Sequence, residues 1–307
     1  MPLPLETFLK WEKENPDRIF LRQPINGVWK TWTRAQAGDE ARRIAKGFHS
    51  LGLKKGDHIA ILSKNCAEWI IADIAIMMAG CISIPIYPTL SASAIEPILI
   101  HSEAKAIIIG KLDDFKSQSN GIPANMIRIS VTAYGISEKN SIEELIANNE
   151  PLQTVYKWNN DEILTIIYTS GTTGKSKGVM HIAGTFGATL TAAIPQLELP
   201  YQPELISYLP LSHIAERVGV EMNALFTCGI ISFAESLESF SKNLAEVQPQ
   251  IFFAVPRIWQ KMREGILSKL SQQKLDIILS IPLINSFFKK SLKKKMGFSR
   301  VSHFYSA

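Results

Sequence analysis

The chain has 307 residues, of which 46% are hydrophobic and 20% are charged. These fractions are near those of soluble globular proteins, which argues against a disordered, collagen-like or low-complexity chain. The length is sufficient for a large core in one or two domains. The net charge is +5, but much of the excess lies between Lys289 and Lys295, so the charge indicates little about partners of the remaining chain.

The N-terminus and the cysteines indicate a cytoplasmic protein. The first residues, MPLPLETFLKWEKENPD, lack the basic start and apolar block of a secretory signal peptide. Three cysteines, Cys66, Cys81 and Cys228, lie far apart within apolar runs. An odd number with this spacing argues against a disulfide framework or a zinc site, so we expect buried free thiols.

The first part of the chain shows alternating strand and helix patterns. Asn26-Gly27 between two β-rich runs indicates a hairpin. Thr33 and Gln36 form a capping-box pattern for a helix that should end near Gly52. The next segments are predicted as strand, helix, strand, helix and strand, in the order HIAILS, NCAEWIIADIAIMMAG, CISIPIY, SASAIEPILIHSE and AKAIIIG.

Within this part, the most apolar stretch runs from Trp69 to Tyr87. A helix that spans a bilayer needs about 20 consecutive apolar residues. Asp73, Gly80 and Pro85 interrupt the stretch, so we interpret it as a buried helix followed by a buried strand.

The alternation continues after Ser141 and Glu144, which cap a further helix. The later segments are predicted as EILTIIYT (strand), LISYLP (strand), HIAERVGVEMNALFTCG (helix), IISFAE (strand), FSKNLAEVQP (helix) and IFFAVP (strand). From Arg257 the pattern is helical for about forty residues, with a break near Pro282. The final run, VSHFYSA, is predicted to begin a strand.

Short apolar, β-branched strands between helices are typical of a parallel sheet that is covered on both faces. We therefore expect an α/β fold of layered, parallel-rich sheets flanked by helices. Two sublayers are expected, of roughly residues 1–150 and 151–307.

The segment from Thr169 to Gly178, TSGTTGKSKG, has the composition of a phosphate-binding loop. Glycines let backbone N–H groups approach oxyanions, hydroxyl groups donate hydrogen bonds, and lysines supply positive charge. The alternative is a mobile polar hairpin. The residues that would bind a nucleotide are Thr169, Ser170, Gly171, Thr172, Thr173, Gly174, Lys175, Lys177 and Gly178.

The glycine spacing does not fit a Walker loop. That motif, G-x-x-x-x-G-K-[ST], separates its glycines by four residues. Here two residues separate Gly171 from Gly174, and no glycine stands five positions before Gly174. An ordinary P-loop kinase or GTPase is therefore a poor interpretation.

Together with Val179, the loop resembles the signature T-S-G-T-T-G-x-P-K-G-V of the adenylate-forming superfamily; Ser176 stands where the family usually has proline. The resemblance implies that the loop holds the β- and γ-phosphates of ATP, with Thr172 beside Mg²⁺. A carboxylate then attacks the α-phosphorus to give acyl-AMP and pyrophosphate. Coenzyme A takes the acyl group afterwards in the acyl-CoA synthetases of this superfamily.

A second segment, SYLPLSHIAERVG, resembles L-P-L-[SA]-H-x-x-E-R of long-chain acyl-CoA synthetases. The resemblance places His213 at the junction of the carboxylate and nucleotide pockets, which makes it the catalytic candidate. A histidine at a helix start after Pro210 could also merely cap or pack. Glu216 and Arg217 could form an intrahelical ion pair, and we leave their role open.

A third segment, AVPRIWQKM, is similar to V-P-R-[VI]-[WY]-E-K of the same branch. This resemblance favours a fatty substrate and implies that Trp259 lines the acyl tunnel. Core packing is the alternative for a tryptophan at a helix start.

The segment IPLINSFFKKSLKKKMG places Ile284, Phe288, Leu292 and Met296 on one helical face with five lysines around it. One interpretation is peripheral contact with an anionic membrane. The other, which we favour from the sequence, is a packed helix with a solvated basic side. No nucleic-acid motif accompanies these lysines, so no nucleic-acid partner is expected.

In the long-chain family, further motifs follow a segment like SRVSHFYSA: a G-A-A-P stretch, a magnesium-binding glutamate, a T-G-D and a mobile C-terminal domain. We therefore interpret residues 1–307 as an incomplete N-terminal AMP-binding domain without that C-terminal domain. The expected parent activity is long-chain fatty acid:CoA ligase, impaired in this chain alone. The rival hypotheses are a non-catalytic acyl- or nucleotide-binding protein and one half of a split ligase, completed by a separately encoded C-terminal half.

Overall fold

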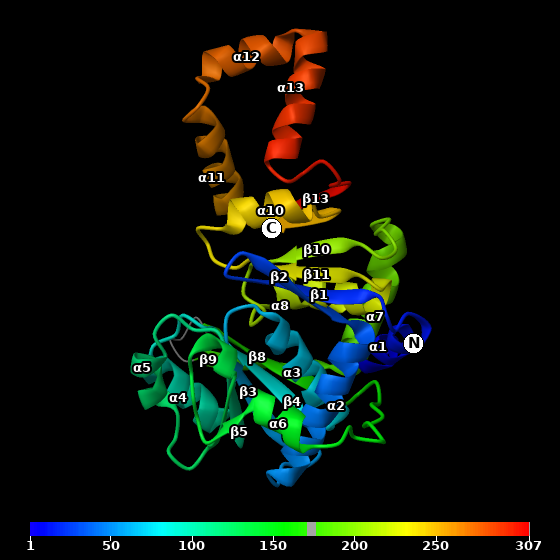
Figure 1. The fold of residues 1–307 in the computed structure, drawn as a ribbon, viewed down its shortest axis with the longest axis vertical. Helices are drawn as coiled ribbons and strands as arrows, with labels where there is room; N and C mark the ends of the chain where they lie inside the picture. Colours follow the sequence, from blue (N-terminus) through cyan, green and yellow to red (C-terminus); the bar gives the residue numbers. More distant parts are fainter. Residues whose placement is uncertain (171–175, 307) are drawn as a thin grey trace.

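The computed structural model describes residues 1–170 and 176–306 (Figure 1). In these ranges a seven-stranded sheet has the order β7-β6-β5-β3-β4-β8-β9. All neighbours in it are parallel except β8 and β9, which form an antiparallel hairpin. Its strands are β3 (His58–Leu62), β4 (Ile82–Ile86), β5 (Ala106–Ile109), β6 (Ile127–Ser130), β7 (Asn140–Ser141), β8 (Ile163–Ser170) and β9 (Ser176–Ile182).

Both faces of this sheet are buried, as the strand pattern predicts. Along β3, Ile59 and Ile61 belong to the same apolar core as helices α2 (Arg34–Ser50) and α3 (Ala67–Met78). The alternate residues, Ala60 and Leu62, belong to a second core under α4 (Ala92–His101). The expected α/β layering is therefore confirmed, and the apolar stretch from Trp69 to Tyr87 is a buried helix and strand.

Two capping boxes begin helices where the sequence predicts them. The Gln36 N–H donates to Thr33 Oγ1 (3.2 Å), and the Thr33 N–H donates to Gln36 Oε1 (2.8 Å). Ser141 and Glu144 make the same reciprocal pair at the start of α6 (Ile142–Asn148). The cysteines are also as expected, because all three are buried and free.

The four-stranded sheet has the order β10-β11-β1-β2. It consists of β1 (Ile19–Ile25), β2 (Val28–Thr33), β10 (Glu204–Ser207) and β11 (Ile230–Phe233). The predicted Asn26-Gly27 turn joins β1 to β2, with positive φ at both residues (50° and 77°), as a two-residue hairpin requires.

The expected sublayers of roughly residues 1–150 and 151–307 stay a prediction, and each of the two larger sheets combines strands from both ranges. The N-terminal hairpin pairs with β11, about 200 residues later, through Leu21 and Ile231, while β8 and β9 complete the first sheet. Strand pairing over such a distance is not encoded in the local pattern from which the boundary was inferred.

Helices dominate the remaining elements. The segment predicted as one helix from His213 consists of α8 (Ile214–Glu216), the π-helical η3 (Arg217–Met222) and α9 (Asn223–Thr227). Other elements are α1 (Pro4–Glu14), α5 (Phe115–Gln118), η1 (Ser119–Gly121), η2 (Thr132–Tyr134), α7 (Ala183–Gln196) and α10 (Phe240–Val247). None of the helices within the described ranges is long and apolar enough to cross a bilayer.

A helical extension stands away from the two larger sheets (Figure 1). It contains α11 (Pro256–Leu267), α12 (Gln272–Ser280) and α13 (Pro282–Lys295). At its base, β12 (Ile251–Ala254) pairs in parallel with β13 (His303–Ser306), so the final run is a strand as predicted. The helical break comes just before Pro282, also as predicted.

A fully buried arginine connects the two larger sheets. Arg217 Nη2 donates to Asp73 Oδ2 on α3 (2.7 Å), and Arg217 Nε lies 3.1 Å from Glu221 Oε2 on η3. Arg217 Nη1 reaches Ser83 on β4 and Thr165 on β8 at 3.3 and 3.4 Å. Arg217 therefore pairs with Asp73 and Glu221, not with Glu216 as one interpretation of the sequence allowed.

Replacing this arginine should destabilise the fold strongly. Arg217→Met leaves the Asp73 carboxylate buried without its cation, which we expect to cost about 3–5 kcal/mol of unfolding free energy. Lys242→Met is the control, because Lys242 and Glu246 form an exposed i,i+4 pair that contributes less than about 1 kcal/mol. Urea unfolding of both variants measures the difference, and equal losses would contradict the prediction.

Candidate functional site

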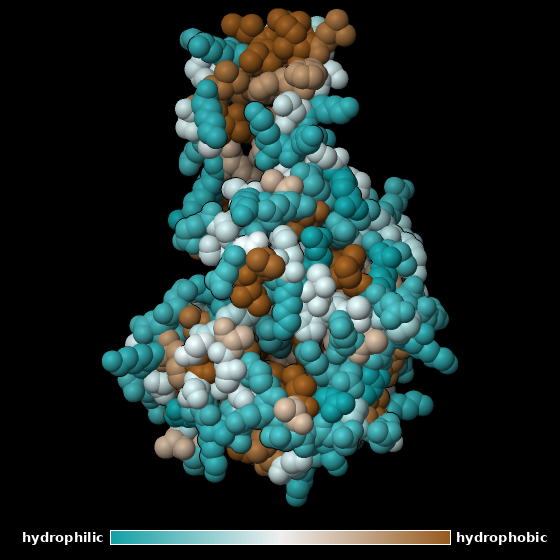
Figure 2. Space-filling view, in the orientation of Figure 1, coloured by the Kyte–Doolittle hydropathy of each residue, from teal (hydrophilic) through white to brown (hydrophobic). Residues whose placement is uncertain are grey.

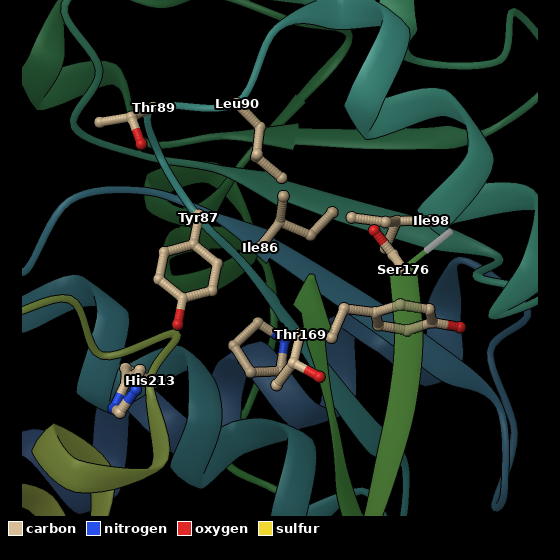
Figure 3. A pocket seen from close by; sticks show the side chains of 10 residues that line it. Ile86, Tyr87, Thr89, Leu90, Ile98, Thr169, Ser176 and His213 are labelled. Carbon is tan, nitrogen blue, oxygen red and sulfur yellow. The ribbon is translucent and has the colours of Figure 1, made fainter. Parts of the chain in front are cut away.

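A cavity of about 370 Å³ lies where the ends of β4 and β8 meet the loop before α8 (Figure 3). This volume is within the range of small-molecule sites. It is lined by Pro85, Ile86, Tyr87, Thr89, Leu90, Ile98, Tyr168, Thr169, Ser176 and His213.

The sheet topology brings these residues together. Strands β4 and β8 are parallel neighbours, paired at Ser83 and Thr165, so their carboxyl ends lie at the same edge of the sheet. Ligands bind preferentially at this edge in open α/β sheets. Tyr87 follows β4, and Thr169 lies near the end of β8; in Figure 3 the Tyr87 hydroxyl points in the direction of His213.

The phosphate-loop residues that the structure describes lie at the ends of the β8–β9 hairpin. Thr169 lies opposite Lys177 in the strand register, and both Thr169 and Ser176 line the cavity. Lys177 is exposed and is not a lining residue. The expected nucleotide contacts of Gly171, Thr172, Thr173, Gly174 and Lys175, and of the Ser170 side chain, fall outside the described residues.

Gly178 permits close packing beneath the cavity. It lies opposite Tyr168 in the hairpin. A Cβ atom at this position would lie 2.8 Å from Ile166 Cγ2 and 3.1 Å from Tyr168 Cζ, closer than carbon atoms approach without displacement. The glycine therefore allows the Tyr168 ring to occupy its place in the cavity wall.

His101 orients the same tyrosine. The Tyr168 hydroxyl and His101 Nδ1 are 2.7 Å apart, and the two rings meet edge to face. His101 lies at the end of α4, and nothing in its local sequence distinguishes it from a surface histidine. The sequence reasoning therefore missed this contact.

His213 lines the cavity, and its side chain caps α8, so the capping alternative is confirmed and its catalytic role stays a prediction. Its Nδ1 accepts a hydrogen bond from the Ala215 N–H at 3.1 Å. A neutral imidazole that accepts at Nδ1 carries its proton on Nε2. Nε2 is therefore the ring atom that can donate to a ligand.

A buried network holds the loop that presents His213. Glu216 Oε1 accepts from the Ser207 hydroxyl (2.8 Å) and from the Tyr208 N–H (2.9 Å). Asn65, in the loop between β3 and α3, donates to Ser207 Oγ (2.8 Å) and accepts from the Leu211 N–H (3.1 Å). The network ties the histidine loop to both sheets. Sequence reasoning left Glu216 without a role and did not identify Asn65.

Burial raises the pKa of the Glu216 carboxyl to about 8, although the hydrogen bonds from Ser207 and from the backbone oppose the shift. At neutral pH this carboxyl is therefore mainly protonated. A neutral side chain can remain buried in the network without a cationic partner.

Trp259 lies apart from the cavity. Its Nε1 donates to the Ala254 carbonyl at 3.1 Å. Its ring packs edge to face against Phe252, and its centroid lies 5.9 Å from that of Phe304. These contacts place it in the apolar cluster at the base of the extension. The expected tunnel role stays a prediction.

Thr172 is the one residue that the sequence analysis places beside a metal ion, and it lies outside the described residues. Within residues 1–170 and 176–306, no group of three or more His, Cys, Asp or Glu side chains is arranged to hold a metal ion.

Gly178→Ala should perturb the cavity wall. Because the added methyl group overlaps Ile166 and Tyr168, we expect a loss of about 1–3 kcal/mol in unfolding free energy. Gly265→Ala is a matched control inside α11, where an added Cβ would have no neighbour within 4 Å. That substitution should be stabilising by up to about 1 kcal/mol. Denaturant unfolding tests both, and a stabilised Gly178→Ala variant would contradict the packing argument.

Glu216 should contribute a measurable pH dependence of stability. Its pKa in the folded chain is about 8, against 4.5 ordinarily, so the folded state binds this proton more tightly. The contribution to stability is complete below pH 4.5 and is lost as the pH rises toward 8. Glu216→Gln cannot titrate and should remove up to about 1.4 kcal/mol per pH unit of this slope.

The measurement is the unfolding free energy of parent and variant across the interval from pH 4.5 to pH 8. Glu14→Gln, on the exposed surface of α1, is the control and should keep the slope of the parent. A Glu216→Gln variant with an unchanged slope would show that the carboxyl is ionised throughout.

Comparison with known proteins identifies the family of this chain. The family profile described as AMP-binding enzyme matches residues 8–299. A long-chain-fatty-acid–CoA ligase of Mycobacterium tuberculosis, FadD15, is 29% identical over 82% of this chain and 43% of its own length. A long-chain-fatty-acid–CoA ligase of Xenopus laevis, ACSBG2, is 31% identical over 81% of this chain and 36% of its own length.

Solved structures share the fold. The A-PCP didomain of carboxylic acid reductase from Segniliparus rugosus, in complex with AMP, superposes with a TM-score of 0.80 over 99% of this chain and 48% of that one, at 18% identity. The N-terminal domain of FACL13 from Mycobacterium tuberculosis gives a TM-score of 0.74 over 100% and 70%, at 21% identity. This chain spans about 40% of the length of the curated relatives named above. With its profile match over nearly the whole chain, the protein belongs to the AMP-binding enzyme family.

Proposed function

We propose that this chain contributes the ATP- and acyl-binding part of a long-chain fatty acid:CoA ligase. The proposal rests on one observation: Thr169 and Ser176, from the phosphate-type hairpin, line the same cavity as His213, from the opposite loop. Such a ligase activates the fatty acid as acyl-AMP and then transfers the acyl group to coenzyme A.

The donors around the cavity are suited to phosphate and carboxylate oxygens. The hydroxyl groups of Thr169 and Ser176 can donate to phosphate, and Lys177 can add positive charge at the hairpin. The Nε2–H of His213 can donate to the oxygen at which the carboxylate meets the α-phosphate. Fixed donors of this kind accelerate adenylyl transfer because they are already oriented toward the developing charge.

The proposal also includes the loop residues that lie outside the described ranges. Gly171, Thr172, Thr173, Gly174 and Lys175, with Ser170 before them, would hold the β- and γ-phosphates. Mg²⁺ bound with ATP near Thr172 would neutralise phosphate charge.

Apolar side chains of the cavity and the names of the relatives both support a fatty substrate. Ile86, Leu90 and Ile98 form an apolar wall beside the donors. The two curated relatives are named long-chain-fatty-acid–CoA ligases. We propose a fatty acid as the acyl substrate and a tunnel that passes Trp259.

The chain spans less than half the length of these relatives, so the complete reaction is proposed for it together with a C-terminal half. We propose that a separate chain carrying that half can complete the reaction. We propose a cytoplasmic location, where ATP and coenzyme A are available. A protein that only binds acyl chains or nucleotides is the alternative, and the exchange reaction below distinguishes them.

The first test measures binding of a non-hydrolysable acyl-adenylate analogue by calorimetry. His213→Ala and Thr169→Val should each weaken binding by about tenfold or more, because each removes a hydrogen bond to a charged ligand. His49→Ala and Thr185→Val, at exposed positions of α2 and α7, are the matched controls and should bind like the parent. Equal affinity of all four variants would reject the cavity as the adenylate site.

The second test measures ATP–pyrophosphate exchange after the chain is combined with the C-terminal half of a relative. Fatty acids should support exchange and acetate should not. Analogue binding without any exchange, for every acid tested, would favour the binding-only alternative.

A further inference from the structure

The helical extension accounts for the net positive charge of the protein. Residues 256–297 contain ten basic and two acidic side chains, a net charge of +8, against +5 for the complete sequence. The other residues therefore carry a net charge of −3. On α13 all five charged side chains are lysines. Positive charge is thus concentrated on the part that stands away from the sheets (Figure 1).

The far end of this extension is apolar. Figure 2 shows a hydrophobic surface at the end where α12 meets α13. Leu283 and Phe287 are 87% and 78% exposed, and their neighbours Ile277, Ile281 and Ile284 are also exposed. We call these five residues the apolar tip. Monomeric soluble proteins seldom expose such contiguous apolar clusters without a binding role.

Contacts between α12 and α13 hold the apolar tip in shape. Helices α12 and α13 pack against each other, with Ile278, Leu279 and Phe288 half-buried in this region. Asn285 Nδ2 donates to the Leu279 carbonyl across the corner at 2.7 Å. Of the face expected from the sequence, Phe288, Leu292 and Met296 are half-buried, but Ile284 is exposed. Leu283 and Phe287 lie outside that face.

The distance along α13 between the apolar tip and the lysines fits the depth of a lipid interface. A helix rises about 1.5 Å per residue, so Lys289 lies about 9 Å and Lys295 about 18 Å along α13 from Leu283. Interfacial helices bury apolar side chains about 5–10 Å below the headgroups. With the tip inserted to that depth, Lys289 and Lys290 would lie at the level of the anionic headgroups.

We propose that the apolar tip and the α13 lysines form a docking site for an anionic lipid bilayer. Charge identifies the occupant. An apolar tip alone fits many partners, but the five lysines directly behind it favour a bilayer, in which an apolar interior lies beneath a layer of negatively charged headgroups. Docking would place the protein where long-chain fatty acids partition. The inference uses no feature of the cavity and does not depend on the proposed ligase activity.

The experiment is co-sedimentation of the 307-residue chain with vesicles, without ATP or fatty acid. Phosphatidylcholine vesicles containing phosphatidylglycerol should bind the chain, and pure phosphatidylcholine vesicles should bind it far more weakly. Added salt should weaken binding, because the lysines act within a Debye length of the surface. Equal binding to both vesicle types would overturn the proposal.

Two double variants separate the apolar from the electrostatic part. Leu283→Ser with Phe287→Ser should weaken partitioning by roughly tenfold or more. Lys289→Gln with Lys290→Gln should weaken it on the order of 30-fold, since each lysine near an anionic surface contributes about a factor of five. All four side chains are exposed, so near-UV circular dichroism and thermal melting should match the parent.

The controls make the same chemical changes elsewhere. Leu237→Ser removes a side chain that is 84% exposed but lies between β11 and α10, and Lys46→Gln with Lys139→Gln removes two exposed lysines. Both controls should bind vesicles like the parent. Unchanged vesicle binding of the tip variants would overturn the proposal. So would tip variants that change only the oligomeric state, which would identify a second copy of the chain as the occupant.

Discussion

The buried Arg217 guanidinium is the interaction on which the relation between the two larger sheets depends. It reaches Asp73 on α3, Ser83 on β4 and Thr165 on β8, all part of the seven-stranded sheet and its covering helix. Its own backbone begins η3, which leads to the four-stranded sheet. Buried charges are costly unless they are paired, so few other placements of η3 could satisfy this group. A charge that must be neutralised by distant residues therefore fixes how the layers meet.

The cavity results from the way in which Arg217 joins the two larger sheets. Thr169 belongs to the seven-stranded sheet, whereas His213 lies on the loop between β10 and α8. Glu216 directly precedes Arg217, so the short turn that places the arginine also anchors the loop through Ser207 and Asn65. Burial favours the neutral form of Glu216, and the network can hold the loop without a cationic partner for this carboxyl group. Donors from the β8–β9 hairpin and from the loop before α8 thus converge on one cavity.

Net charge and apolar surface are unevenly distributed along the length of the molecule. Outside residues 256–297 the chain has a net charge of −3, whereas the extension has a net charge of +8 and carries the apolar tip (Figure 2). This arrangement suits the proposed amphiphilic substrate, because the surface that we propose for lipid lies apart from the cavity that we propose for phosphate. The aromatic cluster around Trp259 forms the base between them.

Most helices and strands, and the chemistry of the hairpin, can be predicted from the amino-acid sequence. Alternating apolar runs, the Thr33 and Ser141 caps and the glycine- and hydroxyl-rich loop act over a few residues, so local propensity and spacing suffice to predict them. Other features become evident only in the folded chain: β1 pairs with β11, a π-helix follows Glu216, Arg217 pairs with Asp73, and His101 and Asn65 support the site. These features depend on which distant groups share a low-dielectric interior. These groups become buried and paired only when the layers pack together, so the associated free energy cannot be inferred from any short segment.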